Sequence, residues 1–120
     1  MTSNIRPLTL EDVIRVRGEP FPQTTRGVAV DVDGELAAIA AVLHTKPFQV
    51  YSETLVEPKK HPMTVMRAVK ALKPILDSYS APIYAVADKR HQNAPAFLQR
   101  IGFEYVETNE TGMIYRWRTQ

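Results

Sequence analysis

Cysteine is absent from the 120 residues, which excludes disulfide bridges, thiol catalysis and the sulfur-rich kinds of zinc site. The chain also lacks any apolar run near the roughly 20 residues that a membrane-spanning helix needs. Its first residues, MTSNIRP, carry no apolar signal segment. Histidines are few and scattered, so no metal site is expected. We therefore expect a cytoplasmic protein without membrane contact.

No charge of one sign dominates the chain. Its 15 basic and 13 acidic residues are interspersed and give a net charge of +2. Binding to nucleic acid through phosphate contacts usually needs a concentrated basic face, so this balance does not call for such a partner. With 44% hydrophobic and 23% charged residues and no internal repeat, the composition predicts a single globular domain over residues 1–120.

The N-terminal half has the signals of a strand, a helix and a meander of three strands. Residues 5–8 predict a short strand, and Thr9, followed three residues later by Asp12, is typical of a helix start. That helix should end near Gly18, with a buried side of Leu10, Val13, Ile14 and Val16. Strands are predicted over residues 27–33, 35–44 and 48–56, with a two-residue turn at Asp33-Gly34 and another turn at Lys46-Pro47.

The C-terminal half alternates helices and strands. A helix is predicted from Pro62, with an apolar stripe of Val65, Met66, Val69, Leu72 and Leu76 and a basic face of Arg67, Lys70 and Lys73. Pro74 should kink or end it near Lys73. Residues 83–87 predict a buried strand, and residues 94–101 a short helix whose apolar residues, Phe97, Leu98 and Ile101, pack inward. Two final strands, 103–107 and 113–118, are joined by a five-residue loop.

This order of elements predicts an α/β fold. It consists of a mixed, mostly antiparallel sheet of about seven strands with three helices. The strands before and after the long helix, 48–56 and 83–87, are expected to be parallel neighbours. Ligands favour the end of such a sheet, where neighbouring connections diverge.

Two stretches resemble motifs of the GNAT superfamily, the acetyl-CoA-dependent N-acyltransferases, and the resemblance covers nearly the whole chain. Residues 56–66, VEPKKHPMTVM, are similar to the family's Val-x-Pro-x-x-(Arg or Gln)-Gly-x-Gly-x-(Gly or Ala) turn. Residues 91–103, HQNAPAFLQRIGF, are similar to its Asn-x-x-Ala-x-x-x-Tyr-x-(Lys or Arg)-x-Gly-Phe pattern. The resemblance implies a GNAT fold, acetyl-CoA as the cofactor, and an amine of a small molecule or a protein as the acceptor.

In the family, backbone N–H groups of the first motif and the following helix hold the cofactor's pyrophosphate. Four marked positions of the motif carry other residues here: His61, Pro62, Thr64 and Met66. Side chains at these positions therefore narrow the pyrophosphate site, and Pro62 removes one backbone N–H donor. Lys60 and His61 offer positive charge in compensation, and Thr64 offers a hydroxyl donor. The cofactor-binding residues that the resemblance implies are Leu55, Val56, Lys60, His61, Met63, Thr64, Val65, His91 and Asn93.

Direct acetyl transfer needs a base for the attacking amine, and the family commonly uses a carboxylate on the strand beside the cofactor. Glu53 is the candidate general base by this resemblance, and Glu57, nearer the turn, could instead activate an amine through water. Tyr51 and Tyr84 could contribute hydroxyls. Leu98 stands where the family often has a general-acid tyrosine, and leucine has no proton to give. The connection before Gly27 is short where the family usually has a second helix. This implies a shallow acceptor site or one completed by another subunit.

Three functions stay open. The first is acetyl transfer to an amine. The second is a non-catalytic GNAT-fold module, because IRP near the start and FLQRIG near the end are also similar to bacteriophage-encoded GNAT-like proteins, including an internal virion protein. Such a module would serve in the virion or the host cytoplasm. The third is a nucleic-acid binder, whose basic residues lack an aromatic stacking platform. A homodimer through the final strands is also compatible with the family, since Tyr115 and Trp117 could pack on a partner or on the protein's own core.

Overall fold

The computed structural model describes residues 3–55, 62–87 and 94–118. Within these ranges, ten elements follow in the predicted order. They are β1 Ser3–Pro7, α1 Leu10–Arg17, β2 Thr25–Val32, β3 Glu35–Leu43, β4 Phe48–Thr54, α2 Pro62–Asp77, β5 Ile83–Ala87, α3 Ala94–Ile101, β6 Phe103–Asn109 and β7 Gly112–Trp117.

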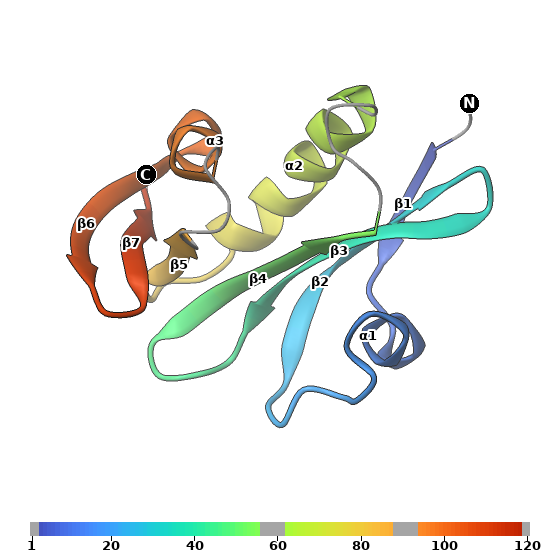
Figure 1. Cartoon of the computed structure of the whole chain (residues 1–120), viewed down its shortest axis with the longest axis horizontal. Helices are drawn as coiled ribbons and strands as arrows, with labels where there is room; N and C mark the ends of the chain where they lie inside the picture. Colours follow the sequence, from blue (N-terminus) through green and yellow to red (C-terminus); the bar gives the residue numbers. More distant parts are fainter. Residues whose placement is uncertain (1–2, 56–61, 88–93, 119–120) are drawn as a thin grey trace.

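All strands of the described chain join one seven-stranded sheet in the order β1-β2-β3-β4-β5-β7-β6 (Figure 1). Neighbouring strands are antiparallel except β4 and β5, which are parallel. The predicted fold class, a mixed and mostly antiparallel sheet with three helices, is therefore confirmed. Of the helices described, none combines the length and the apolar character needed to cross a membrane.

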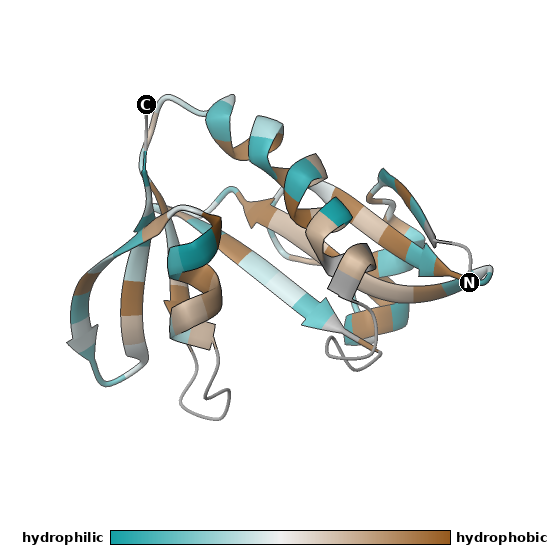
Figure 2. Cartoon of the chain, turned by 90° about the horizontal axis from the view of Figure 1, so that it is seen from above, coloured by the Kyte–Doolittle hydropathy of each residue, from teal (hydrophilic) through white to brown (hydrophobic). Residues whose placement is uncertain are grey.

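The helices divide between the two faces of the sheet (Figure 1). α2 and α3 lie on one face, over a core cluster that joins Leu72 of α2, Ile83 of β5 and Ile101 of α3. α1 lies on the opposite face, where Val16 packs against a smaller cluster. Figure 2 shows hydrophilic and hydrophobic residues alternating along α2, as in a helix that is buried on one side. The two faces of β4 therefore have different surroundings.

α1 begins with the capping box that the sequence predicts. The Thr9 hydroxyl accepts a hydrogen bond from the Asp12 backbone N–H at 3.3 Å, and the Asp12 carboxylate accepts one from the Thr9 N–H at 2.9 Å. The predicted buried side is wrong in part, because Leu10 and Ile14 are exposed. Val13 and Asp12 are buried instead. An ion pair between the Asp12 carboxylate and β1 turns this side of the helix toward the sheet.

The hairpin of β2 and β3 also follows the prediction. Asp33 and Gly34 have positive φ angles of 51° and 81°, as a two-residue type I′ turn requires. Val32 faces Glu35 across this turn. The next strand, β4, ends at Thr54 within the described residues.

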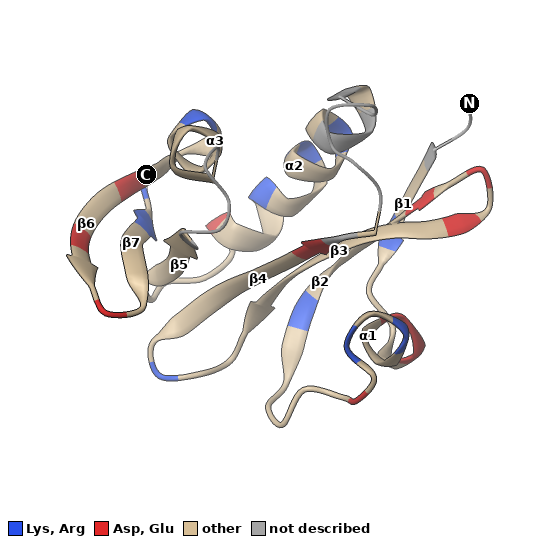
Figure 3. Ribbon diagram, in the orientation of Figure 1, with Lys and Arg blue, Asp and Glu red and all other residues tan. Residues whose placement is uncertain are grey.

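Pro74, which was expected to kink or end the helix near Lys73, lies inside α2, which continues to Asp77. A proline in the last turn removes only one helical N–H. The burial of Leu76, which is 1% exposed, holds that turn against the sheet. Met66 was expected in the apolar stripe but is exposed, since it lies beside the buried stripe rather than on it. The predicted basic face is confirmed on the exposed side of α2 (Figure 3), with Arg67, Lys70 and Lys73.

The last two strands are joined more tightly than predicted. Asn109 of β6 faces Gly112 of β7, so the connection is a two-residue turn instead of a five-residue loop. The Asn109 side-chain oxygen accepts a hydrogen bond from the Thr111 N–H at 2.9 Å, which stabilises the turn. Tyr115 and Trp117 are buried in the protein's own core. Tyr115 and Trp117 were expected to pack either on a partner or on the protein's own core, and the structure shows them packed on the core.

Candidate functional site at the divergence of two parallel strands

β4 and β5, the parallel pair of the described sheet, separate soon after they begin. Phe48 pairs with Ile83, and Gln49 pairs with Tyr84. Beyond these pairs β4 continues beside β3 and β5 beside β7, and the two strands diverge (Figure 1). The backbone groups that residues 50–54 present toward β5 therefore have no strand partner within the described chain. An extended ligand with amide groups can hydrogen-bond to such an open edge.

Exposed apolar side chains follow the two diverging strands. Leu55 follows β4 directly, Val86 lies on β5, and Met63, Met66 and Phe97 lie in the first two turns of α2 and α3; all five are exposed. Phe97 was expected to be buried, and that prediction is wrong because Leu98 and Ile101 occupy the inward side of the short α3. Exposed apolar surface beside an open strand edge favours a ligand site.

Two of the predicted cofactor-binding residues, Leu55 and Met63, belong to this exposed group. Thr64 and Val65 lie in the first turn of α2. The remaining five lie outside the residues that the structure describes, and their role stays a prediction: Val56, Lys60, His61, His91 and Asn93. In the described part of the chain, no cluster of three or more His, Cys, Asp or Glu residues could hold a metal ion.

Glu53, the predicted general base, is brought into contact with Tyr51, two residues earlier on β4. Alternate residues of a strand share a face, and these two lie on the face of the sheet that α1 covers. The Tyr51 hydroxyl donates a hydrogen bond to Oε2 of Glu53. Tyr51 is partly buried against the smaller core cluster, whereas Glu53 is exposed. A hydroxyl and a carboxylate therefore stand together on the strand that has the open edge.

The connection between α1 and β2, residues 18–24, contains no helix and lies against Tyr51. The ring of Phe21 packs edge-on against the Tyr51 ring, with centroids 5.1 Å apart and planes at 79°. The Arg17 guanidinium lies 4.3 Å from the centre of the Phe21 ring. Sequence reasoning missed Phe21, although an aromatic residue between two prolines in a polar segment was an available signal. The short connection thus places the Phe21 ring against Tyr51, the hydrogen-bond partner of the candidate base Glu53.

The surroundings of Tyr51 keep its phenol protonated. Burial raises the pKa of Tyr51 to about 12, and the hydrogen bond to Glu53 and the charge of that carboxylate add to the rise, while Arg17 opposes it. Because this pKa is far above neutral pH, Tyr51 is a hydrogen-bond donor under ordinary conditions. Among the described residues, Tyr51 engages Oε2 of the Glu53 carboxylate, and the other oxygen is left for an incoming group.

A second cluster of charges joins β1, α1 and β2, away from β4 and β5. The Nη1 and Nη2 atoms of Arg6 donate to the two Asp12 carboxylate oxygens at 2.7 and 2.8 Å, and Nε donates to Asp31 at 2.7 Å. The hydrogen bond from Arg6 lowers the pKa of Asp12 to about 2, although burial of Asp12 opposes this change. Each charge in the cluster has a partner. We therefore assign the cluster to stability rather than to chemistry.

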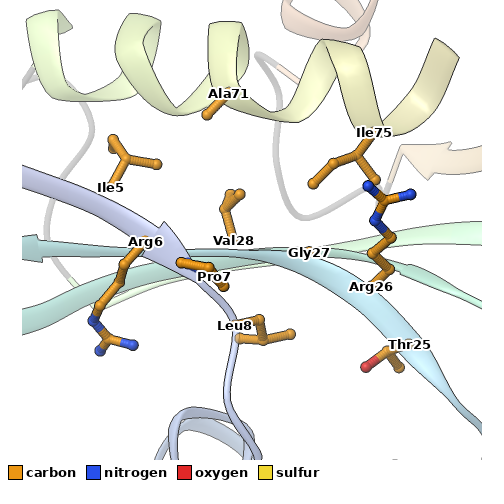
Figure 4. Close-up of a pocket in the computed structure, with 10 residues that line it drawn as sticks. All are labelled: Ile5, Arg6, Pro7, Leu8, Thr25, Arg26, Gly27, Val28, Ala71 and Ile75. Carbon is orange, nitrogen blue, oxygen red and sulfur yellow. The ribbon is translucent and has the colours of Figure 1, made fainter. Parts of the chain in front are cut away.

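A cavity of about 430 Å³ also lies away from β4 and β5, between α2 and the first two strands (Figure 4). Its apolar lining consists of Ile5, Pro7, Leu8, Val28, Ala71 and Ile75. Arg26 lies beside Ile75 at one end of it (Figure 4). No carboxylate belongs to this lining, so the cavity has no candidate base for an amine. The divergence of β4 and β5, which has Glu53 beside it, therefore remains the better candidate site.

No family model matches this sequence, and no curated protein is significantly similar to it. Solved structures nevertheless match its fold. PaiA N-acetyltransferase from Thermoplasma acidophilum, in complex with coenzyme A, is 12% identical, with a TM-score of 0.70 over 98% of this chain and 99% of that chain. A ribosomal-protein-alanine N-acetyltransferase from Escherichia coli is 12% identical, with a TM-score of 0.69 over 97% and 93%.

Spermidine N-acetyltransferase from Vibrio cholerae is 12% identical, with a TM-score of 0.65 over 94% of this chain and 92% of that chain. Acetyltransferases of the GNAT family from other bacteria are also among the matches. At such low identities the likeness concerns the fold and leaves the activity to be argued from the site. This chain has the fold of the GNAT acetyltransferases.

Proposed function

We propose that this protein transfers an acetyl group from acetyl-CoA to an amine. The observation that carries the proposal is the divergence of β4 and β5 in a GNAT fold, with Glu53 on β4. The similar structures are N-acetyltransferases by name, and one of them is a complex with coenzyme A. Because a fold hosts many functions, the proposal depends on the residues beside the open edge.

The open edge fits the extended, amide-bearing part of coenzyme A. The backbone of residues 50–54 offers donors and acceptors, and Leu55 and Met63 offer apolar contacts to methylene groups. The first turn of α2 has backbone N–H groups and the positive end of the helix dipole, which suit a pyrophosphate. In this proposal the cofactor is held by the set that the sequence predicts: Leu55, Val56, Lys60, His61, Met63, Thr64, Val65, His91 and Asn93.

When bound, acetyl-CoA supplies a thioester carbonyl that an amine can attack. Glu53 accepts a proton from the incoming ammonium group, directly or through one water, and so frees the nitrogen lone pair. A carbon–nitrogen bond forms as the carbon–sulfur bond breaks. The products are the acetylated amine, coenzyme A as its thiol, and one proton. Leu98 packs against the core and has no proton to donate, so in this scheme the sulfur receives its proton from solvent.

Binding is tested first, by isothermal titration and thermal unfolding with acetyl-CoA and with coenzyme A. A ligand that binds only the native state raises its stability, by about 2.7 kcal/mol at 100 times the dissociation constant. We expect heat of binding and a higher Tm with both molecules. No heat and no change of Tm at millimolar cofactor would remove the basis for acetyl transfer.

Catalysis is tested with a panel of amines and two carboxylate variants. Glu53→Gln should lower kcat by about 100-fold or more, because it removes the proposed base. It should leave the affinity for acetyl-CoA unchanged. Glu107→Gln is the matched control, since Glu107 is an exposed carboxylate on the edge strand β6. Equal kcat values for the two variants would remove Glu53 from the mechanism.

A non-catalytic GNAT-fold module, acting in a virion or in contact with host proteins, is the second candidate. It is favoured by Leu98, an apolar residue packed against the core where the family often has a general-acid tyrosine. This candidate predicts neither cofactor binding nor acetyl transfer. The titration described above therefore separates the two functions.

A further inference from the structure

We propose that Tyr51 is a positioning residue that orients the Glu53 carboxylate, and that Phe21 holds Tyr51 in place for this purpose. The inference rests on the proposed function, because it assigns a role within the same site. Its basis is a continuous series of contacts from the end of α1 to β4: the Arg17 guanidinium lies on the Phe21 ring, and the Phe21 ring packs on Tyr51. The Tyr51 hydroxyl then meets Glu53.

The hydrogen bond from Tyr51 to Glu53 fixes the orientation of the Glu53 carboxylate. Glu53 is exposed, and a free glutamate side chain samples many rotamers. The Tyr51 hydroxyl donates to Oε2 and so selects one orientation. Because the pKa of Tyr51 is raised to about 12, the phenol remains the donor at any pH at which an amine acceptor would be used. The other carboxylate oxygen is then the one left to accept a proton from substrate.

The contacts of Arg17 with Phe21 and of Phe21 with Tyr51 keep the Tyr51 ring in place. Nη1 of Arg17 donates to the carbonyl oxygens of Glu19 and Pro20 at 3.3 and 2.8 Å. These bonds fix the backbone just before Phe21. Phe21 lies between two prolines, whose φ angles are fixed by their rings. Its edge-on contact with Tyr51 is a favourable geometry for aromatic pairs. The short connection therefore holds the Phe21 ring in a position where it packs against Tyr51 and restricts its movement.

A double-mutant cycle tests the contact without using activity. Tyr51→Phe, Glu53→Ala and the double variant are unfolded in urea at neutral pH, and the free energies of unfolding are compared. We expect Tyr51→Phe to destabilise the otherwise unchanged chain but to have little further effect when Glu53 is already alanine. Tyr105→Phe is the matched control, because its hydroxyl bonds to Thr108 on β6. Additive effects of Tyr51→Phe and Glu53→Ala would overturn the proposal.

Kinetics test the positioning role. With a productive acceptor amine, Tyr51→Phe should lower kcat by about 10-fold to 100-fold and leave KM for acetyl-CoA unchanged. Phe21→Ala should act in the same direction, Phe21→Tyr should retain the wild-type kcat because it keeps the ring, and Tyr105→Phe should have no effect. An active protein in which Tyr51→Phe keeps the full kcat would overturn the positioning role alone. Absence of acetyl transfer by the unchanged protein would instead overturn the proposed function.

Discussion

Replacement of Asp12 by asparagine should remove the contribution of this carboxylate to the acid sensitivity of the fold. The Asp12 side chain is 8% exposed and pairs with Arg6 at 2.7 Å. The hydrogen bond from Arg6 holds the pKa of Asp12 at about 2, against 3.8 for an ordinary aspartate. One pKa unit corresponds to about 1.4 kcal/mol. Protonation of Asp12 in the native state therefore costs about 2.5 kcal/mol more than in the unfolded chain.

The sign of the pH dependence follows from which state binds the proton more tightly. Since the pKa of Asp12 is lower in the folded protein, acid favours the unfolded chain. The contribution of this carboxylate is present above pH 3.8 and is lost as the pH falls through about 2. Asp12→Asn has no such proton to bind. It should lose about 2.5 kcal/mol at neutral pH, because Arg6 keeps only Asp31, and it should then show a flatter decline in acid.

Urea unfolding at a series of pH values from about 5 downward measures this difference. The fluorescence of Trp117 reports on unfolding, because it is the single tryptophan and is 6% exposed. Glu11→Gln is the matched control, since Glu11 lies in the same first turn of α1 but is exposed. A decline in acid that is equally steep for Asp12→Asn and for the unchanged protein would refute the reasoning.

Two further substitutions test the packing in the same assay. Gly27→Ala should lower the free energy of unfolding by about 1–3 kcal/mol, because its Cβ would lie 2.1 Å from the Ala40 carbonyl oxygen. An unchanged stability would contradict the close approach of β2 and β3. Leu76→Ala should lose about 2–5 kcal/mol, since Leu76 is 1% exposed. Lys73→Ala, exposed on the same helix, should change the stability by no more than about 0.5 kcal/mol, and equal losses would contradict the packing of the last turn of α2.

Features with a local cause were predicted well from the sequence. The hairpin at Asp33-Gly34 depends on residues that tolerate positive φ, and the start of α1 depends on Thr9 and Asp12, which bond to each other. Predictions that needed a distant partner were less accurate. Leu10 and Ile14 have the helical spacing of a buried stripe, but the pairing of Asp12 with β1 turned another side of α1 inward.

In the candidate site, too, features with a local cause could be predicted from the sequence, and features that depend on a distant partner could not. Glu53 could be named from its place on a predicted strand, and Tyr51 as a hydroxyl on the same face. Phe21 could not be connected to either of them, because the side chain that contacts a strand from a loop depends on the path of the whole connection. Of the two outcomes predicted for Pro74, a kink or an end of α2, the end near Lys73 failed for a related reason. The proline signal at Pro74 is local, whereas the burial of Leu76 that outweighs it is tertiary.

What can be derived from this sequence alone is the α/β class, the order of the elements and the neighbours within each hairpin. Periodicity and turn chemistry are properties of a few adjacent residues, so they can be read without knowing the fold. Only the tertiary structure decided that β4 and β5 diverge after two residue pairs and that Phe21 packs on Tyr51 beside Glu53. These arrangements join segments that are distant in the chain, and they result from the twist and packing of the complete sheet.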